Sequence, residues 1–507
     1  MKLRQSFLSA LTLVLASTFV NAQDAAALTG PGLPSRKPAV TTDGLERLIS
    51  RSKLLAHAEQ FFSFAQLSNG NRAFGSKGHE ATIQYIKRLL DRTGYYDVEF
   101  QTFTYPYAES RSQLTVDGKD LLTQAFTYSP GGDVTAPIAI VSNVGCEASD
   151  YPTLTGKIAL IKRGDCDFGL KVAYAGGAGA SGAIIYTNVD TAPSGGTLGQ
   201  PSRPEGPYVP SAFIHKADGE AFISRINAGE EVVASIHATA ISEDRSTSNV
   251  IATTKQGDRD NIIVAGAHSD SVPAGPGLND DGSGSMGILE VALNLAKFKV
   301  KNAVRFIWWS AEEFGLVGSE YYVEHLSDEE RQKIALYLNF DMIASPNAGF
   351  FVFDGDGNAT DIPGPAGSEV IETLYRGYFD SHNIRTGSAV FGGSSDYQPF
   401  VDVGIPSGGL MTGAGGLKTA EGAEWWGGEA GVAYDRCYHQ LCDNLENLFV
   451  DAWERNSKAI AYSIATYAQG IEGIPRTPRP PTRTLRVSKL SYEQRLHLTC
   501  DHDDDAA

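Results

Sequence analysis

The chain has 507 residues, 42% of them hydrophobic and 20% charged, a composition typical of globular proteins rather than disordered or fibrous ones. Its 60 acidic residues exceed its 42 lysines and arginines, which gives a net charge of −18. Such a surface repels phosphate backbones and anionic lipid, so we expect binding to neither nucleic acid nor membranes. The length predicts roughly two to four domains, and we expect the protein to be a monomer.

The first 22 residues have the pattern of a secretory signal peptide. Basic residues precede the apolar run 7–20, and Val20-Asn21-Ala22 fits a cleavage site. The apolar run is too short for a membrane-spanning helix, and no second run of about 18 apolar residues follows. We therefore expect a secreted protein, with the vacuolar lumen as the alternative destination.

An oxidising compartment permits disulfides and glycosylation. The five cysteines are too few for a disulfide scaffold and lack zinc-finger spacing. We expect the pairs Cys146–Cys166 and Cys437–Cys442, which leave Cys500 over, because other pairings would join regions that we assign to separate domains. Asn358 begins the only N-glycosylation sequon and is expected to be modified.

The composition and periodicity of the sequence change twice in the first half of the chain. Residues 23–43 read as a leader or pro-segment, and helical periodicity follows over 44–66 and 77–92. From 106 to 245, short β-rich runs are divided by glycine and proline turns around one helix, 168–177. We interpret this region as a compact inserted domain.

After residue 245, apolar strands alternate with helices. This rhythm predicts an α/β fold with a mixed, mostly parallel sheet between layers of helices. The expected strands are 261–268, 303–309, 336–340, 350–353 and 407–411, and the expected helices are 285–298, 317–325, 369–380 and 445–468. With 44–105, the stretch 246–470 forms the main domain, and 471–507 is a proline-rich linker with an acidic tail.

Acidic and imidazole side chains follow the ends of these strands. Ligands of open parallel sheets collect at that edge, so we expect these groups to converge there. The set comprises His268, Asp270, Asp280, Asp281, Glu312, Glu313 and Asp341, with a further imidazole at His439. So much negative charge is costly without cations, and imidazole with carboxylate is the ligand set of catalytic zinc.

Each residue alone has a simpler interpretation. A single histidine at a strand end is more often a core residue, and adjacent acids such as Glu312 and Glu313 suit the first turn of a helix. Asp280 could cap a helix, and Asp341 a turn. The coincidence of all of them at strand ends argues for a shared site.

Five ordered segments resemble the co-catalytic zinc aminopeptidases, particularly secreted fungal leucine aminopeptidases and vacuolar aminopeptidase Y. The segments are GAHSDSVPAGPGLNDDGSG (266–284), WWSAEEFGLVGS (308–319), NFDMI (339–343), SSDYQPF (394–400) and DRCYHQLCD (435–443). NGNRAFGSKGHEAT (69–82) is similar to the opening of that peptidase domain, and 156–188 looks like part of a protease-associated domain. The resemblance spans about 60–470.

The resemblance implies two zinc ions in each chain. Asp280 would bridge them, His268 and Asp341 would complete one site, and Glu313 and His439 the other. Each ion would then have three protein ligands and an open position, as catalytic zinc requires. The family also implies a cis peptide bond between Asp280 and Asp281.

Three further side chains receive roles beside the metals. Glu312 would be the general base that takes a proton from water and returns it to the leaving amine. Asp270 would orient the His268 imidazole, and Tyr438 would donate to the tetrahedral oxyanion, although its ring could equally serve only for packing.

These features predict a zinc-dependent aminopeptidase that acts on peptides with a free N-terminus. A carboxypeptidase would need an arginine for the terminal carboxylate, and 262–300 contains none, while Arg436 looks structural. Phenylalanine and leucine over 391–417 favour leucine-like substrates. Alternatives are a carboxypeptidase or dipeptidase, a glutaminyl cyclase with one zinc, and a non-catalytic binding protein.

Overall fold

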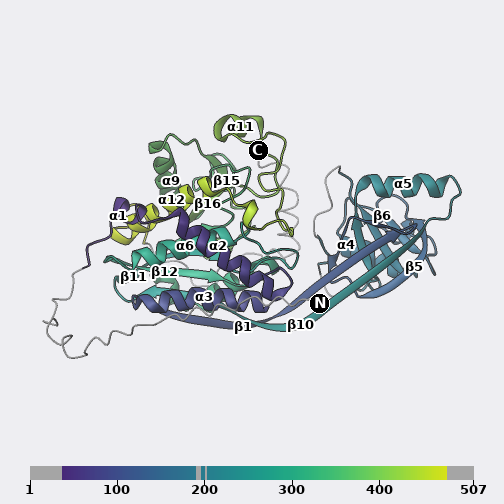
Figure 1. The fold of residues 1–507 in the computed structure, drawn as a ribbon, viewed down its shortest axis with the longest axis horizontal. Helices are drawn as coiled ribbons and strands as arrows, with labels where there is room; N and C mark the ends of the chain where they lie inside the picture. The colour runs from purple at the N-terminus through teal and green to yellow at the C-terminus, as the bar shows by residue number, and fades with distance from the viewer. Residues whose placement is uncertain (1–36, 190–195, 200–201, 477–507) are drawn as a thin grey trace, which may run out of the picture. The chain divides into compact units, whose positions relative to one another are not determined.

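The computed structural model describes residues 37–189, 196–199 and 202–476 (Figure 1). The chain divides into two compact units, and of the first, Met1–Pro38, only the last two residues are described. The expected signal peptide, most of the leader, Cys500 and the acidic tail lie outside the described residues. All described helices and strands belong to the second unit, Ala39–Ala507.

The main domain is built from two segments of the chain on either side of the insert. Its elements are α1 (Thr42–Glu46), α2 (Arg51–Ala65), η1 (Gln66–Ser68), α3 (Lys77–Thr93), β1 (Tyr96–Val116), β10 (Val233–Thr254), β11 (Asp258–His268), α6 (Gly282–Leu295), β12 (Asn302–Trp309), η3 (Glu312–Phe314), α7 (Val317–Glu324), α8 (Asp328–Lys333), β13 (Ile334–Phe340), β14 (Phe351–Phe353), α9 (Ser368–Ser381), β15 (Gly387–Ala389), α10 (Gln398–Asp402), β16 (Ser407–Met411), α11 (Ala420–Trp426), η4 (Leu445–Asn447) and α12 (Val450–Gln469).

The sheet of this domain is mixed and mostly parallel, which confirms the expected fold class. Its strand order is β15-β14-β16-β13-β11-β12-β10, with β1 beside β10. β13, β11 and β12 are parallel, as are β13 and β16, whereas β10 is antiparallel to β12. Every residue of β13 is buried, as are the last seven of β11, because helices cover both faces.

Two hydrophobic cores fill the space between the sheet and its helices. On one face, α2, α3, α6, α9 and α12 contribute Phe61, Ile86, Ile288, Tyr375 and Trp453. On the other face, α7 and α10 contribute Tyr322 and Phe400, which pack with Trp309 of β12. Burial on both sides fixes the strand register and with it the positions of the strand ends.

Strands β1 and β10 form one continuous antiparallel ribbon (Figure 1). They pair from Tyr96 opposite Thr254 to Val116 opposite Ala234. The expected boundaries at 105/106 and 245/246 fall inside this ribbon, so no loop marks either of them. The exact domain boundaries stay a prediction.

The insert is β-rich, as expected. Its elements are β2 (Lys119–Leu121), β3 (Thr123–Gln124), β4 (Phe126–Thr127), β5 (Gly132–Ile140), η2 (Ala148–Asp150), β6 (Ile158–Lys162), α4 (Phe168–Gly177), β7 (Gly182–Tyr186), β8 (Gly196–Thr197), β9 (Ser211–Ile214) and α5 (Lys216–Asn227). β5, β6, β7 and β9 are parallel neighbours, and β5 also pairs with β10.

Among the described residues, no helix is long and apolar enough to cross a bilayer.

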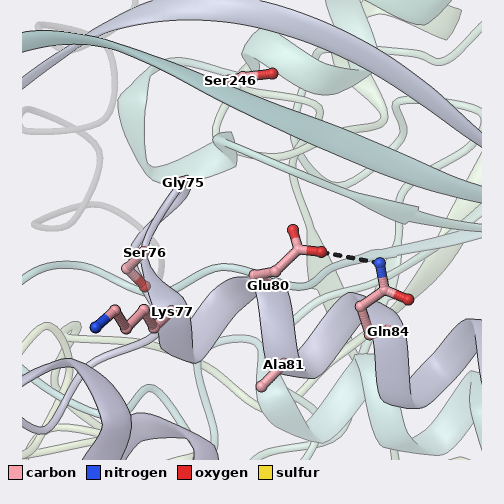
Figure 2. A pocket seen from close by; sticks show the side chains of 7 residues that line it. All are labelled: Gly75, Ser76, Lys77, Glu80, Ala81, Gln84 and Ser246. Carbon is pink, nitrogen blue, oxygen red and sulfur yellow. Dashed lines mark hydrogen bonds between the residues drawn. The ribbon is translucent and has the colours of Figure 1, made fainter.

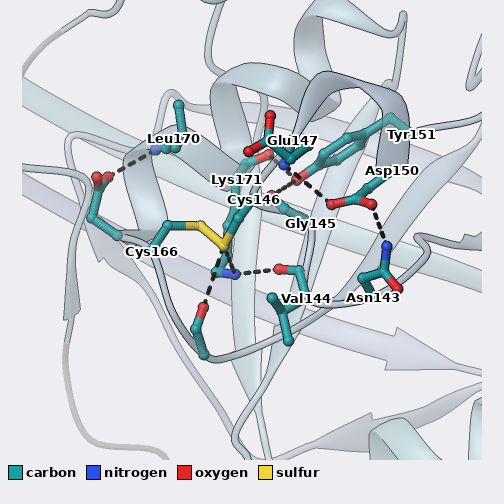
Figure 3. Close-up of a disulfide and its surroundings, with 12 residues drawn as sticks. Asn143, Val144, Gly145, Cys146, Glu147, Asp150, Tyr151, Cys166, Leu170 and Lys171 are labelled. Atoms are coloured by element: carbon teal, nitrogen blue, oxygen red, sulfur yellow. Dashed lines mark hydrogen bonds between the residues drawn. A yellow bond between two sulfur atoms is a disulfide. The ribbon is translucent and has the colours of Figure 1, made fainter.

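A disulfide between Cys146 and Cys166 fixes a loop of the insert (Figure 3). Lys171 of α4 is buried beneath it, donates to the Val144 carbonyl and lies 3.5 Å from Cys146 Sγ. Burial lowers the pKa of Lys171 to about 8. The Tyr151 hydroxyl donates to the Lys171 carbonyl at 3.0 Å, so the loop, the disulfide and α4 form one hydrogen-bonded unit.

Candidate active site

The strand ends place the predicted site residues at one edge of the sheet. β11 ends at His268, and Asp341 follows directly after β13. β12 leads into η3, which begins with Glu312 and Glu313. Carboxylates and an imidazole that follow neighbouring parallel strands therefore lie at the same edge of the sheet.

Asp280 lies between the two imidazoles. Its Oδ1 is 3.2 Å from His268 Nε2, and its Oδ2 is 3.0 Å from His439 Nε2. Glu313 Oε2 lies 3.0 Å from the same His439 nitrogen. On the other side, His268 Nε2 is 3.7 Å from Asp341 Oδ1. Residues far apart in the sequence therefore form two groups, His268 with Asp341 and Glu313 with His439, and Asp280 belongs to both.

Glu313 and Asp341 are the carboxylates at the two ends of this cluster. A hydrogen-bond donor of the protein holds one oxygen of each. The Val272 amide donates to Glu313 Oε1 at 3.0 Å, and the Ser395 hydroxyl donates to Asp341 Oδ2 at 2.6 Å. In each case the second oxygen faces an imidazole. Protein donors therefore orient both carboxylates, each through one oxygen.

The neighbouring aspartates at 280 and 281 have different environments. Asp281 Oδ1 accepts the amides of Gly284 and Met342, and its Oδ2 accepts that of His268. Backbone donors thus occupy Asp281, which caps α6, while Asp280 faces the imidazoles. The peptide bond between them is cis.

His439 reaches the cluster from a short loop that the Cys437–Cys442 disulfide closes. The loop approaches so closely that a Cβ on Gly275 would lie 2.1 Å from the Gln440 carbonyl oxygen. The Tyr438 ring stacks on the His439 imidazole, with centroids 3.8 Å apart. The disulfide and this stacking hold the second imidazole over Asp280.

Glu312 and Asp270 both lie beside His268. Glu312 Oε2 is 3.8 Å from His268 Nε2. Asp270 is fully buried, and its Oδ1 accepts the Glu312 amide at 3.2 Å and lies 3.6 Å from His268 Nδ1, which is longer than a hydrogen bond. Asp270 therefore contacts both the imidazole and the backbone of Glu312.

The protonation equilibria of these residues are strongly perturbed. Burial raises the pKa of Glu312, Glu313 and Asp341 above their ordinary values. Burial alone would lower the pKa of His268, but the carboxylates of Glu312 and Asp341 outweigh it and raise that pKa well above its usual range. Such perturbation is typical of functional sites.

Arg72 supports the site from behind and had no assigned role in the sequence analysis. Its buried guanidinium donates to the carbonyls of Ser269, Pro276 and Gly277, which belong to the loop between β11 and α6. Burial lowers its pKa to about 10, so it stays charged at neutral pH. The only signal was its place in the 69–82 segment, because its carbonyl partners become neighbours only on folding.

Asp443 is a second supporting residue that sequence reasoning missed. Its two carboxylate oxygens accept the amides of Asn279 and Asp280 at 2.9 and 3.0 Å. Asp443 therefore holds the backbone of Asp280, the residue shared by the two groups, although it lies 163 residues further along the chain.

The donor set fits divalent metal ions. Each group offers imidazole nitrogen and carboxylate oxygen, the ligands of catalytic zinc. Asp280 Oδ2 and Asp341 Oδ1, which lie on the side of the imidazoles, are buried and make no hydrogen bond. A buried unpaired polar atom requires an explanation such as a bound ion. Potential ligand atoms of His268, Asp280 and Glu313 lie within 4.8 Å of one another.

A hollow of about 490 Å³ lies elsewhere, at the start of α3 (Figure 2). It is lined by Gly75, Ser76, Lys77, Glu80, Ala81, Gln84 and Ser246. Its lining includes none of the predicted site residues, and two of its lining side chains, Gln84 and Glu80, are joined by a hydrogen bond that Gln84 donates. We assign it no part in catalysis.

An α/β sheet with imidazoles and carboxylates at its strand ends is typical of metal-dependent hydrolases. Residues 249–464 match peptidase family M28, and residues 134–222 match the PA domain. The chain is 47% identical to the probable leucine aminopeptidase 2 of Aspergillus fumigatus over 472 residues, 93% of each chain. It belongs to peptidase family M28, carries a PA domain and is a peptidase.

Solved structures show the same fold. An aminopeptidase from Aneurinibacillus sp. strain AM-1 is 29% identical with a TM-score of 0.60, over 87% of this chain and 97% of that one. A zinc aminopeptidase from Bacillus subtilis is 27% identical with a TM-score of 0.61, over 83% and 97%.

Proposed function

We propose that the protein is a metallo-aminopeptidase that releases N-terminal residues, with a preference for leucine-like side chains, from peptides. The observation that carries the proposal is the shared carboxylate of Asp280, whose two oxygens face two different imidazoles at 3.2 and 3.0 Å. A carboxylate in that position can bridge two cations. The names of the fungal and bacterial relatives support the aminopeptidase activity.

The metals would be two zinc ions. His268 and Asp341 would hold one ion, Glu313 and His439 the other, and Asp280 both. Zinc fits the mixed nitrogen and oxygen ligands, and the Bacillus subtilis relative is a zinc enzyme. When bound, such ions lower the pKa of water and polarise the scissile carbonyl.

Glu312 would be the general base. Its carboxylate lies at the cluster, 3.8 Å from His268 Nε2, but belongs to neither ligand set. Because burial raises its pKa, it can take a proton from the attacking water and hold it until the leaving amine accepts it. Asp270 would keep the His268 ring in place, and the Tyr438 hydroxyl would donate to the oxyanion.

The charged groups around the site support cleavage at the N-terminal rather than the C-terminal end of the peptide. Acidic groups near the metals suit a free α-ammonium, whereas a carboxypeptidase needs a free arginine. Arg436, beside the His439 loop, pairs with Glu429 at 3.0 Å. This pairing favours the aminopeptidase over the carboxypeptidase alternative.

The setting of the enzyme is part of the proposal. Two disulfides fit an oxidising compartment, so we propose secretion, with a vacuolar destination as the alternative. Asn358 is exposed, as a glycosylated asparagine must be.

The test is digestion of the tripeptide Leu-Gly-Gly and of its N-acetylated form, with and without a chelator. Free leucine should appear only from the unblocked peptide and only without chelator. Cleavage of the acetylated peptide, or release of C-terminal glycine first, would contradict the proposal. Leu, Lys and Glu anilides then test side-chain preference, since faster cleavage of Lys or Glu would refute the leucine assignment.

A further inference from the structure

A second acidic cluster lies between β14 and α9. It consists of Asp354 and Asp356, which follow β14, and Glu372 of α9. One carboxylate oxygen from each lies within 4.8 Å of the others. Asp354 is fully buried and Glu372 nearly so, at 5% exposure. Three carboxylates this close repel one another unless a positive charge lies among them.

Asp354 has one oxygen that is fully bonded and one that is not. Its Oδ2 accepts the amides of Ala359 and Thr360 at 3.0 and 2.7 Å and the Thr360 hydroxyl at 2.8 Å. Its Oδ1 is buried and has no hydrogen-bond partner. The cluster thus contains a buried carboxylate oxygen without a hydrogen-bond partner, which a bound cation would satisfy.

Glu372 fixes the geometry and the charge of the cluster. Its Oε2 accepts the Gly355 amide at 2.9 Å, and its Oε1 accepts Arg376 Nε at 2.6 Å. Arg376 offsets one of the three negative charges. The remaining charge of −2 matches one divalent cation.

The loop sequence repeats an oxygen-bearing residue at every second position. Asp354, Asp356 and Asn358 alternate with glycines, a spacing shared with the first half of calcium-binding loops, although Ala359 stands where the EF-hand has its invariant glycine. Asn358 donates its backbone and side-chain N–H groups to Asp356 and so orients that exposed carboxylate.

We propose that Asp354, Asp356 and Glu372 form a calcium site. The ligands are all hard oxygens without nitrogen or sulfur, which favours calcium over zinc. The bound ion would tie the loop after β14 to the first half of α9. This site is independent of the proposed peptidase chemistry.

The test is calorimetric titration of the full-length, zinc-loaded protein with CaCl₂, so that the zinc ligands are already occupied. We expect one calcium per chain, with a Kd on the order of 10⁻⁴ to 10⁻³ M as in extracellular modules. Asp356→Asn should weaken binding at least tenfold, and because Asp356 is exposed, the variant should still fold. Asp354→Asn should abolish binding.

Asp361→Asn is the matched control. Asp361 is an exposed acid of the same loop outside the cluster, so this variant should bind calcium as the wild type does. Enzymatic removal of any glycan at Asn358 should leave one calcium site, which separates the cation from a glycan. No calcium binding by the wild type up to 10 mM (about ten times the upper Kd), unchanged binding by Asp356→Asn, or equal affinity for Mg²⁺ would overturn the proposal.

Discussion

The two acidic clusters of the main domain orient their carboxylates in the same way but differ in their partners. At the active site, each end carboxylate is fixed through one oxygen and presents the other to an imidazole, as Asp341 does to His268. In the loop after β14, Asp354 is likewise fixed through one oxygen, but its other oxygen has no hydrogen-bond partner and its cluster contains only carboxylates. We infer that supporting donors orient the carboxylates of both clusters, and that the presence of imidazole decides which cation each cluster would suit.

Replacing the general base gives the largest expected effect. Glu312→Gln should lower kcat about 10²- to 10⁴-fold, because only the proton transfer is lost. Zinc content should be unchanged, since Glu312 is not a ligand in our assignment. Kinetics with leucine anilide and metal analysis of the same preparation check both points. An active variant would remove Glu312 from the mechanism.

Removing one imidazole separates the two halves of the active site. His439→Ala should reduce zinc from two ions to one per chain, because His268 and Asp341 remain. Gln440→Ala, in the same disulfide loop, serves as the control and should keep both ions. Equal loss of both ions from His439→Ala would argue against separate terminal ligands.

The supporting donors can be tested without touching a ligand. Ser395→Ala removes the 2.6 Å hydrogen bond to Asp341 and should cost about 10- to 100-fold in zinc affinity or activity. Ser394→Ala changes the adjacent serine and should have a much smaller effect. If the two variants behave alike, pre-orientation of Asp341 does not matter.

The pH dependence of stability has a specific contributor behind the active site. The pKa of His79 is lowered from 6.5 to about 4. Burial is the largest cause, and the positive charges of Arg72 and His268 lower the pKa further. Between these values the unfolded chain takes up a proton that the folded chain does not, so stability falls as pH falls, by up to about 3 kcal/mol.

Denaturant unfolding at pH 7 and pH 4.5 checks this contribution. His79→Gln, whose amide can still reach Ser269, should show a smaller loss on acidification than the wild type. The exposed His325→Gln should behave like the wild type. An unchanged pH dependence in His79→Gln would contradict the assigned cause.

The sequence predicted the strands best where burial on both faces leaves a continuous apolar run, as in β11 and β13. The change in composition after residue 105 predicts a domain boundary there, yet β1 continues without a break to Val116. Pro106 is tolerated because β1 pairs there with β10 alone and needs no second partner.

For the site, residue types at strand ends were enough to predict that His268, Asp280 and Asp341 would meet. Arg72 and Asp443 could not be predicted, because they act on backbone groups that only folding brings near them. The proposed calcium site was missed for a similar reason, since Glu372 reaches the loop from a separate helix.

The most direct test of the account is the number of zinc ions that the metal-stripped, full-length chain binds in competition with a chromophoric chelator. The shared carboxylate of Asp280 predicts two ions per chain, bound by the wild type and by Glu312→Gln alike. A chain that binds one ion or none would contradict the central claim.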